Sequence, residues 1–389
     1  MKLLYLIAGT YRAAGMEKVL ADKTNWLVRH GYDIVIATTD QRGQAPAFAM
    51  DPAIRQVDLG INYEATNGKN FLVKAFSFPI KKWLHRRRLT KLLMQEKPDV
   101  TVSMFCNDAG FLPKIQDGSK KVLEVHFSRF KRIQYGRKGL WGVADRFMNE
   151  RDAQYVHAFD RFVVLTEEDK GYWGNLPNMV VIPNGVERKD PSPLTAHTVI
   201  AVGRYSFQKA LDRLITAWFM IEDKGDWKLK LVGDGECRDD LFALINEYGM
   251  CDTVEMTGVQ KDMDAVYRDA SVLALSSRYE GLPMVILEAQ AHGVPVVSFA
   301  CQCGPKDAIE DGVNGRLVPE GDVNALARVL DETIHDPAAI RRMGAAAYET
   351  ARRWEPETIM QQWDELFKGL CRCPSSSSPS SVPASTALR

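Results

Sequence analysis

The sequence lacks a long apolar segment, a cysteine pair with metal-binding spacing, and an excess of either charge. No stretch approaches the roughly 18 apolar residues that cross a membrane. The apolar start, residues 1–9, is shorter than the core of a secretion signal and is soon followed by Arg12, so we interpret it as a buried first strand. The 7 cysteines include no C-x2-C pair, which argues against a zinc site and favours a reducing compartment. These absences predict a cytoplasmic protein.

The length of 389 residues exceeds the roughly 250–300 residues at which single hydrophobic cores stop growing, so two domains are expected. Basic and acidic residues number 50 each, but they are unevenly distributed. Residues 1–190 carry a net charge of +9, and residues 191–389 a net charge of −9. The excess is concentrated in residues 69–138, with 17 basic and 5 acidic side chains. Such a segment indicates either an anionic partner or a solvated basic face.

Short apolar runs alternate with helical patterns in both halves of the chain, which is typical of parallel sheets covered by helices. In the first half, strands are predicted at residues 3–8, 33–38, 100–104, 121–125 and 161–165, with a helix at 15–29. In the second half, strands are predicted at residues 198–202, 227–232, 254–257, 272–276, 294–299 and 315–318, with helices at 211–221 and from Pro283. The fold class is therefore α/β, with two Rossmann-like, doubly wound domains.

Prolines and glycines interrupt this pattern near residues 177–197, which separates the two halves. We expect an N-terminal domain at 1–185, a linker at 186–197 and a C-terminal domain at 198–355. A last helix at 356–370 is expected to pack back toward the N-terminal domain. Residues 371–389 are rich in Ser and Pro, so we expect a disordered tail without a catalytic role.

The strongest motif covers residues 277–289 and carries two glutamates separated by seven residues. Pro283 suits the first turn of a helix, which places Glu280 in the preceding loop and Glu288 in the second turn. Free backbone N–H groups at the helix start form an anion site, and the two carboxylates can accept hydrogen bonds from sugar hydroxyls. The N–H groups concerned belong to Leu282, Met284 and Val285. The alternative is a capping glutamate and an unrelated helical one.

A second motif, residues 202–209, follows a predicted strand and precedes a helix. Arg204 and Lys209 thus lie at the carboxyl end of a strand, where open α/β sheets bind ligands. Two cations there can hold a diphosphate without a metal ion. A pair of ordinary surface cations remains the alternative.

Two weaker signals lie in the first half. Gly15 occupies a strand-to-helix turn, where the missing side chain lets another group approach the backbone. His126 follows a predicted parallel strand and is placed to face a cleft, although a lone histidine is more often structural.

In order and spacing, these four motifs resemble glycosyltransferase family 4, whose members are retaining enzymes with the GT-B fold. The resemblance covers about residues 1–370 and is most specific in the second half. The first loop has Ala14-Gly15 in place of the usual glycine pair, and Ala210 follows Lys209 where the family usually has glycine. The N-terminal half, which binds the acceptor, matches only loosely, so the resemblance does not name the acceptor.

The resemblance implies a nucleoside-diphosphate sugar bound in a cleft between the two domains. Arg204 and Lys209 would hold the diphosphate, and Glu280 the donor sugar. Glu288 would bind the ribose, and His126 would lie beside the reacting sugar. The donor-binding set is then Gly15, Arg204, Lys209, Gly281, Leu282, Met284, Val285 and Glu288. The catalytic set is Glu280, His126, Arg204 and Lys209.

The function expected from these residues is transfer of a hexose-type sugar from a UDP-linked donor to a saccharide hydroxyl. The resemblance implies retention of anomeric configuration. No Asp-x-Asp triplet stands between a strand and a loop, so we expect no metal and no cofactor, the nucleotide sugar being a substrate. One alternative is a UDP-sugar 2-epimerase on the same scaffold, because fold does not fix function. The other is a non-catalytic module that binds nucleotide sugars and docks on a membrane.

The basic segment at residues 69–138 suggests an anionic membrane surface as a partner and a peripheral location on the inner face of the cell membrane. Its cations surround Trp83, Leu84 and Phe130, which would add shallow insertion. An acceptor linked to a lipid would lie at such a surface. Nucleic acid is the other anionic candidate, and we rank it lower because no nucleic-acid-binding motif accompanies the charge.

Overall fold

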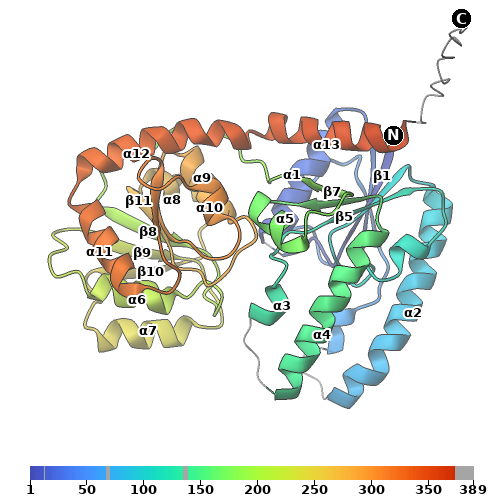
Figure 1. The fold of residues 1–389 in the computed structure, drawn as a ribbon, viewed down its shortest axis with the longest axis horizontal. Helices are drawn as coiled ribbons and strands as arrows, with labels where there is room; N and C mark the ends of the chain where they lie inside the picture. The colour runs from blue at the N-terminus through green and yellow to red at the C-terminus, as the bar shows by residue number, and fades with distance from the viewer. Residues whose placement is uncertain (13, 67–70, 135–138, 373–389) are drawn as a thin grey trace, which may run out of the picture.

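The computed structural model describes residues 1–12, 14–66, 71–134 and 139–372, so the predicted disordered tail lies almost wholly outside the described residues. Two parallel sheets, each covered by helices, form two Rossmann-like domains (Figure 1). This arrangement confirms the predicted α/β fold class. Along the described residues, no helix is both long enough and apolar enough to cross a membrane.

The sheet of the first domain has the strand order β3-β2-β1-β4-β5-β6-β7. Its strands are β1 Lys2–Ile7, β2 Asp33–Thr38, β3 Arg55–Asp58, β4 Val100–Ser103, β5 Lys120–Glu124, β6 Arg161–Val164 and β7 Met179–Val181. All begin and end within one residue of the predicted bounds except β3 and β7, which were not predicted. Both lie at the edges of the sheet. β3 is mostly exposed and β7 is three residues long, so neither shows the apolar run of a central strand.

Helices bury both faces of this sheet. On one face lies α2 (Phe71–Glu96), whose Leu89 and Leu93 are fully buried in the core. On the other face lie α1 (Gly15–Arg29) and α13 (Pro356–Cys371). Trp363 of α13 is 1% exposed and joins the same cluster as Tyr5 of β1. The last helix of the chain therefore completes the core of the first domain, and Figure 1 shows it running along that domain.

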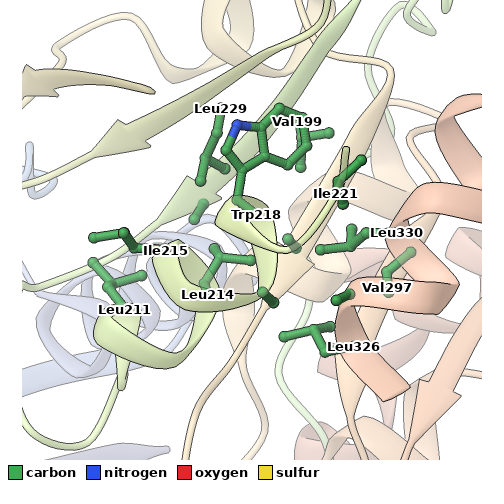
Figure 2. Close-up of a cluster of buried hydrophobic side chains, with 14 of the residues drawn as sticks. Val199, Leu211, Leu214, Ile215, Trp218, Ile221, Leu229, Val297, Leu326 and Leu330 are labelled. Atoms are coloured by element: carbon green, nitrogen blue, oxygen red, sulfur yellow. The ribbon is translucent and has the colours of Figure 1, made fainter. Parts of the chain in front are cut away.

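The sheet of the second domain has the order β10-β9-β8-β11-β12-β13. Its strands are β8 Thr198–Val202, β9 Lys228–Val232, β10 Val254–Gly258, β11 Val272–Leu275, β12 Val296–Phe299 and β13 Gly315–Val318. On one face, α6 (Leu211–Phe219) turns an apolar stripe toward the strands and α11 (Val323–Ile334). Figure 2 shows Trp218 of that stripe packed between Val199 and Leu229 of the sheet.

The other helices connect successive strands or cover the second sheet. They are α3 Lys131–Gln134, α4 Gly139–Tyr155, α5 Glu167–Trp173, α7 Arg238–Glu247, α8 Met263–Arg268, α9 Met284–Ala291, α10 Pro305–Ala308 and α12 Pro337–Thr350. Short 3-10 turns occur at Tyr63–Thr66, Leu112–Lys114, Val156–Ala158 and Ala351–Trp354. Because all strands within each sheet are parallel, the loops that follow them gather at one edge, and these loops carry the site.

Candidate active site

Lys209 and Glu280 form the centre of the site. The Lys209 ammonium lies 2.7 Å from Glu280 Oε1, and the Glu280 carboxylate is almost completely buried. Gln208 donates from Nε2 to the Tyr279 carbonyl at 3.0 Å, which ties the two loops together beside this pair. The structure thus joins the two motifs that the sequence showed as separate. Gln208 was not singled out from the sequence, because nothing in its spacing distinguished it.

The loop after β8 is held by a close crossing with the loop after β9. Gly233 has φ of 142°, and a Cβ atom there would lie 2.0 Å from the Gly203 carbonyl oxygen. The Tyr205 amide also donates to the Asp234 carbonyl at 3.0 Å. Only glycine fits at position 233, and this crossing fixes where Lys209 begins its reach toward the site.

Arg204 lies on the same loop but does not join the Lys209–Glu280 pair in the structure. Its side chain is 74% exposed, and its Nε lies 3.0 Å from Glu236 Oε2. Exposed pairs of this kind contribute about 0–1 kcal/mol. Arg204 can therefore leave Glu236 for a phosphate at small cost.

Helix α9 begins directly after Glu280. Gly281 and Leu282 form the loop, Pro283 is the N-cap, and Met284 and Val285 lie in the first turn. Proline has no side-chain oxygen to cap the helix, so the first-turn N–H groups can donate hydrogen bonds to an anionic ligand.

Glu288 lies in the second turn of α9, in the expected position. Its Oε2 accepts a 2.7 Å hydrogen bond from the Tyr267 hydroxyl on α8. Burial and the nearby Glu288 charge raise the pKa of Tyr267 well above its ordinary value, so the hydroxyl remains a donor. Tyr267 orients Glu288. It could not be recognised from the sequence, because a lone aromatic residue on a short helix usually belongs to the core.

The helices α1 and α9 start opposite each other across the domain interface. Gly15 is the first residue of α1, and a Cβ atom on it would lie 3.8 Å from Met284 Cγ. The N-cap of α1 is Ala14, which, like Pro283, has no side-chain oxygen. Two helix N-termini, each with partial positive charge, therefore face each other at the domain interface, and that of α9 follows Glu280 directly. That arrangement favours a doubly anionic group such as a diphosphate.

His126 enters the site from the loop after β5. A Cβ atom on Gly281 would lie 2.6 Å from the His126 carbonyl oxygen, so the two domains touch here. The His126 Nε2 lies 2.9 Å from Oε1 of the buried Glu124. Glu124 in turn contacts the Lys23 ammonium. Neither Glu124 nor Lys23 was identified from the sequence, because a strand glutamate and a helical lysine look like surface residues.

Comparisons with known proteins agree with this geometry. Residues 13–190 match the family model Glycosyltransferase Family 4, and residues 186–350 match Glycosyl transferases group 1. The amylovoran biosynthesis glycosyltransferase AmsD of Erwinia amylovora is 32% identical, over 94% of this chain and 99% of that protein.

Two solved structures show the same fold. Sucrose-phosphate synthase from Thermosynechococcus elongatus superposes with a TM-score of 0.79 at 20% identity, over 95% of this chain and 98% of that one. Anabaena Alr3699/HepE in complex with UDP-glucose superposes with a TM-score of 0.73 at 18% identity, over 95% and 100%. The chain belongs to glycosyltransferase family 4 and is a glycosyltransferase with the GT-B fold.

Proposed function

We propose that this glycosyltransferase moves a hexose-type sugar from a UDP-sugar to a saccharide hydroxyl, with retention of configuration and without a metal ion. The observation that carries the proposal is the Lys209–Glu280 pair, 2.7 Å long and buried, directly before helix α9, whose N-terminus faces that of α1. The buried carboxylate can accept hydrogen bonds from sugar hydroxyls, and the cation beside it can bind phosphate.

The residues divide the donor among them. Glu280 accepts hydrogen bonds from the donor sugar, and Lys209, Arg204 and the first-turn N–H groups of α9 hold the diphosphate. Glu288, oriented by Tyr267, accepts from the ribose hydroxyls. These groups lie at one edge of the second sheet, so a single extended donor reaches all of them.

In the transfer step, the bond between the anomeric carbon and the phosphate oxygen breaks. The bond to the acceptor oxygen forms on the same face, and the acceptor proton passes to the departing phosphate. Negative charge grows on that phosphate, and the fixed charges of Lys209 and the two helix N-termini stabilise it. This is the work a divalent ion performs in metal-dependent transferases. Asp262 and Asp322 are not metal ligands in this proposal. Each caps a helix and accepts a hydrogen bond from a first-turn amide.

The relatives indicate the setting. AmsD is named for biosynthesis of amylovoran, and we propose a corresponding role in bacterial polysaccharide or glycolipid assembly. The UDP-glucose complex of the HepE neighbour supports a UDP-linked donor.

We further propose that the first domain works at an anionic membrane on the cytoplasmic side. Exposed apolar side chains gather on α2 and α4, which extend beyond the sheet (Figure 1). The most exposed are Phe76 (74%), Ile80 (66%) and Trp83 (60%) on α2, and Val143 (58%) and Phe147 (69%) on α4. Arg86 and Arg87 are exposed on α2 beside Trp83, and Arg87 lies over its ring at 5.6 Å. Lipid headgroups match this combination.

Fewer residues contribute to this proposed membrane surface than the sequence suggested. Leu84 packs against the core, whereas Trp83 is exposed. Arg129 is 9% exposed and its guanidinium lies 4.8 Å from the centre of the Trp173 ring, and Phe130 packs edge-on against Tyr172. We therefore propose that the membrane surface lies on α2 and α4 and does not include Arg129 or Phe130.

The donor experiment tests the proposed transfer. A panel of UDP-, GDP- and ADP-sugars is screened by thermal shift, where a donor at 100 times its dissociation constant adds about 2.7 kcal/mol of stability. The donor found is then incubated alone and with saccharide acceptors, and proton NMR gives the anomeric configuration of the product. An inverted product, or a requirement for a divalent ion, would contradict the proposal. Conversion of UDP-sugar into its 2-epimer without acceptor would replace it with the isomerase.

A further inference from the structure

Behind His126 lies a buried chain of charged groups that sugar transfer as described above does not use. Glu124 is the last residue of β5 and is 0% exposed. Its Oε1 contacts the Lys23 ammonium on α1 and lies 2.9 Å from His126 Nε2. Burial alone would raise the pKa of Glu124, but the adjacent Lys23 charge, with His126 beside it, outweighs burial and holds the pKa at about 2. Glu124 is therefore a permanent carboxylate directly behind a residue of the site.

Helix α13 covers the Lys23 end of this series of charged groups. The Lys23 ammonium lies over the Trp363 ring at 3.7 Å from its centre, and both side chains are buried. Trp363 belongs to α13. A residue near the end of the sequence therefore contacts Lys23, which contacts Glu124, the neighbour of His126. The contact replaces water around Lys23 with an aromatic face.

The energetics do not explain this arrangement as a device for stability. A buried ion pair loses hydration that its attraction barely repays, and well-packed apolar residues in its place are often neutral or stabilising. Removing one partner alone is costly, because it leaves an isolated buried charge. A pair that adds little stability yet contacts a site residue points to a role in the site.

We propose that Glu124 is a positioning residue for His126, and that Lys23 and Trp363 hold Glu124 in place. The inference rests on the proposed transfer reaction. The N–H group at His126 Nε2 donates to Glu124. This contact fixes the ring and its tautomer, and it leaves Nδ1 free to accept a hydrogen bond from a hydroxyl of the donor sugar. Among the described residues, neither His126 Nε2 nor Glu124 Oε2 completes an aligned hydrogen bond. Such bonds are commonly loose before substrate binds and tighten in the complex.

A pair of variants separates positioning from charge balance. Glu124→Gln removes the carboxylate and leaves Lys23 isolated, so both thermal stability and kcat should fall. The double variant Lys23→Met/Glu124→Gln removes the isolated charge. Its thermal stability should recover, but its kcat should stay roughly 10- to 100-fold low with a smaller change in KM, because His126 remains misplaced. The assay is UDP release from UDP-glucose, UDP-galactose and UDP-N-acetylglucosamine, whichever the enzyme accepts.

Two further measurements address the link to His126 itself. In a His126→Ala background, adding Glu124→Gln should lower kcat no further, because the positioned ring is already gone. Nitrogen-15 NMR of the histidine rings, assigned with His126→Ala, should show a single tautomer of His126 in the wild type and a mixture in Glu124→Gln. Tyr32→Phe is the matched control, because Tyr32 also bonds α13, through Asp364 at 2.5 Å. It should leave kcat unchanged.

Three results would overturn the inference: wild-type kcat in the double variant, an undiminished effect of Glu124→Gln in the His126→Ala background, or an unchanged tautomer signal. Failure of the proposed transfer would appear separately, as a wild-type protein that releases UDP from no donor. The NMR comparison would still decide the positioning of His126 in that case.

Discussion

Gly281 of the second domain packs directly on the backbone of His126 in the first, where a Cβ atom would lie 2.6 Å from the carbonyl oxygen. Backbone cannot move aside as a flexible side chain does, so Gly281→Ala should hold the domains slightly apart. A displacement of about 1 Å at a reacting centre costs roughly 100-fold in rate. We expect kcat to fall by that order while UDP affinity, measured by calorimetry, changes little. Gly171→Ala is the control, because a Cβ atom there meets nothing within 4 Å. A normal rate in Gly281→Ala would show that the contact is not needed.

Lys209→Ala and Arg204→Ala should each slow transfer by two or more orders of magnitude, because a preorganised charge at the leaving group contributes roughly 3–4 kcal/mol. The two variants should differ in stability. Lys209→Ala leaves the buried Glu280 without its 2.7 Å partner and should lower the melting temperature. Arg204 is exposed, so its removal should not. Lys230→Ala, which removes a surface pair with Asp269 at 3.0 Å, serves as the control. Near-normal activity in both site variants would remove the diphosphate assignment.

Substitutions of the two glutamates should weaken binding of different parts of the donor. Glu280→Gln should damage recognition of the sugar and the rate, whereas Glu288→Gln should weaken binding of UDP alone. Tyr267→Phe removes the 2.7 Å hydrogen bond that orients Glu288 and should weaken UDP binding by about 1 kcal/mol. Tyr248→Phe is the control, because Tyr248 lies at the end of α7 and its hydroxyl contacts Thr216 of α6 at 3.4 Å. Calorimetry with UDP measures all four, and equal losses of UDP affinity in both glutamate variants would contradict the division.

Stability should fall on mild acidification partly through His85. Burial, with a smaller effect of the Lys82 charge, lowers the pKa of His85 from 6.5 to about 4. Above pH 6.5 the ring is neutral in the folded and the unfolded chain. As the pH falls from 6.5 toward 4, the unfolded chain takes up a proton that the folded chain does not. The loss is on the order of 3 kcal/mol.

Denaturant unfolding at several pH values between 7 and 4 (the window set by that pKa) measures the effect. His85→Phe should lose less stability than the wild type across this range. Asp108 acts in the opposite sense, because burial raises its pKa to about 6, so the wild-type curve contains both effects and only the difference between proteins is interpreted. Parallel curves for His85→Phe and wild type would rule out the His85 contribution.

Membrane association is tested by sedimentation with vesicles. The protein should pellet with vesicles containing anionic lipid, much less with neutral ones, and should be released by salt as screening grows. Arg86→Glu/Arg87→Glu should abolish pelleting and spare UDP binding. Arg88 is left in place because it donates to the Gly60 carbonyl at 3.1 Å and therefore supports the fold. The control is Arg341→Glu/Arg342→Glu, an exposed arginine pair on α12 of the other domain. Equal recovery in the supernatant with both vesicle types at low salt would remove the membrane proposal.

The sequence predicted the sheets well and the site only in part, for physical reasons. Central parallel strands are apolar on both faces, so their positions follow from composition alone. The edge strands β3 and β7 lack that signature. The loops with Lys209 and Glu280 can be recognised in the sequence because glycine and proline mark them. Their contact joins residues 71 positions apart and follows only from the fold.

The residues that support the site could not be found in this way. Lys23 and Glu124 are 101 positions apart, and each has the character of a surface residue in its own segment. Tyr267 has the pattern of a core aromatic. What makes these three important is a neighbour brought by tertiary packing, which no local pattern records.

The place of α13 has a consequence for the order in which the chain acquires its structure. During synthesis β1 to β7 leave the ribosome well before Trp363 and Phe367, which together with α1 bury one face of their sheet. Part of an apolar face of the first domain therefore stays uncovered until the second domain has been synthesised. Separating the two domains at the gene level would leave part of that face exposed in one product, and α13 would remain attached to the other.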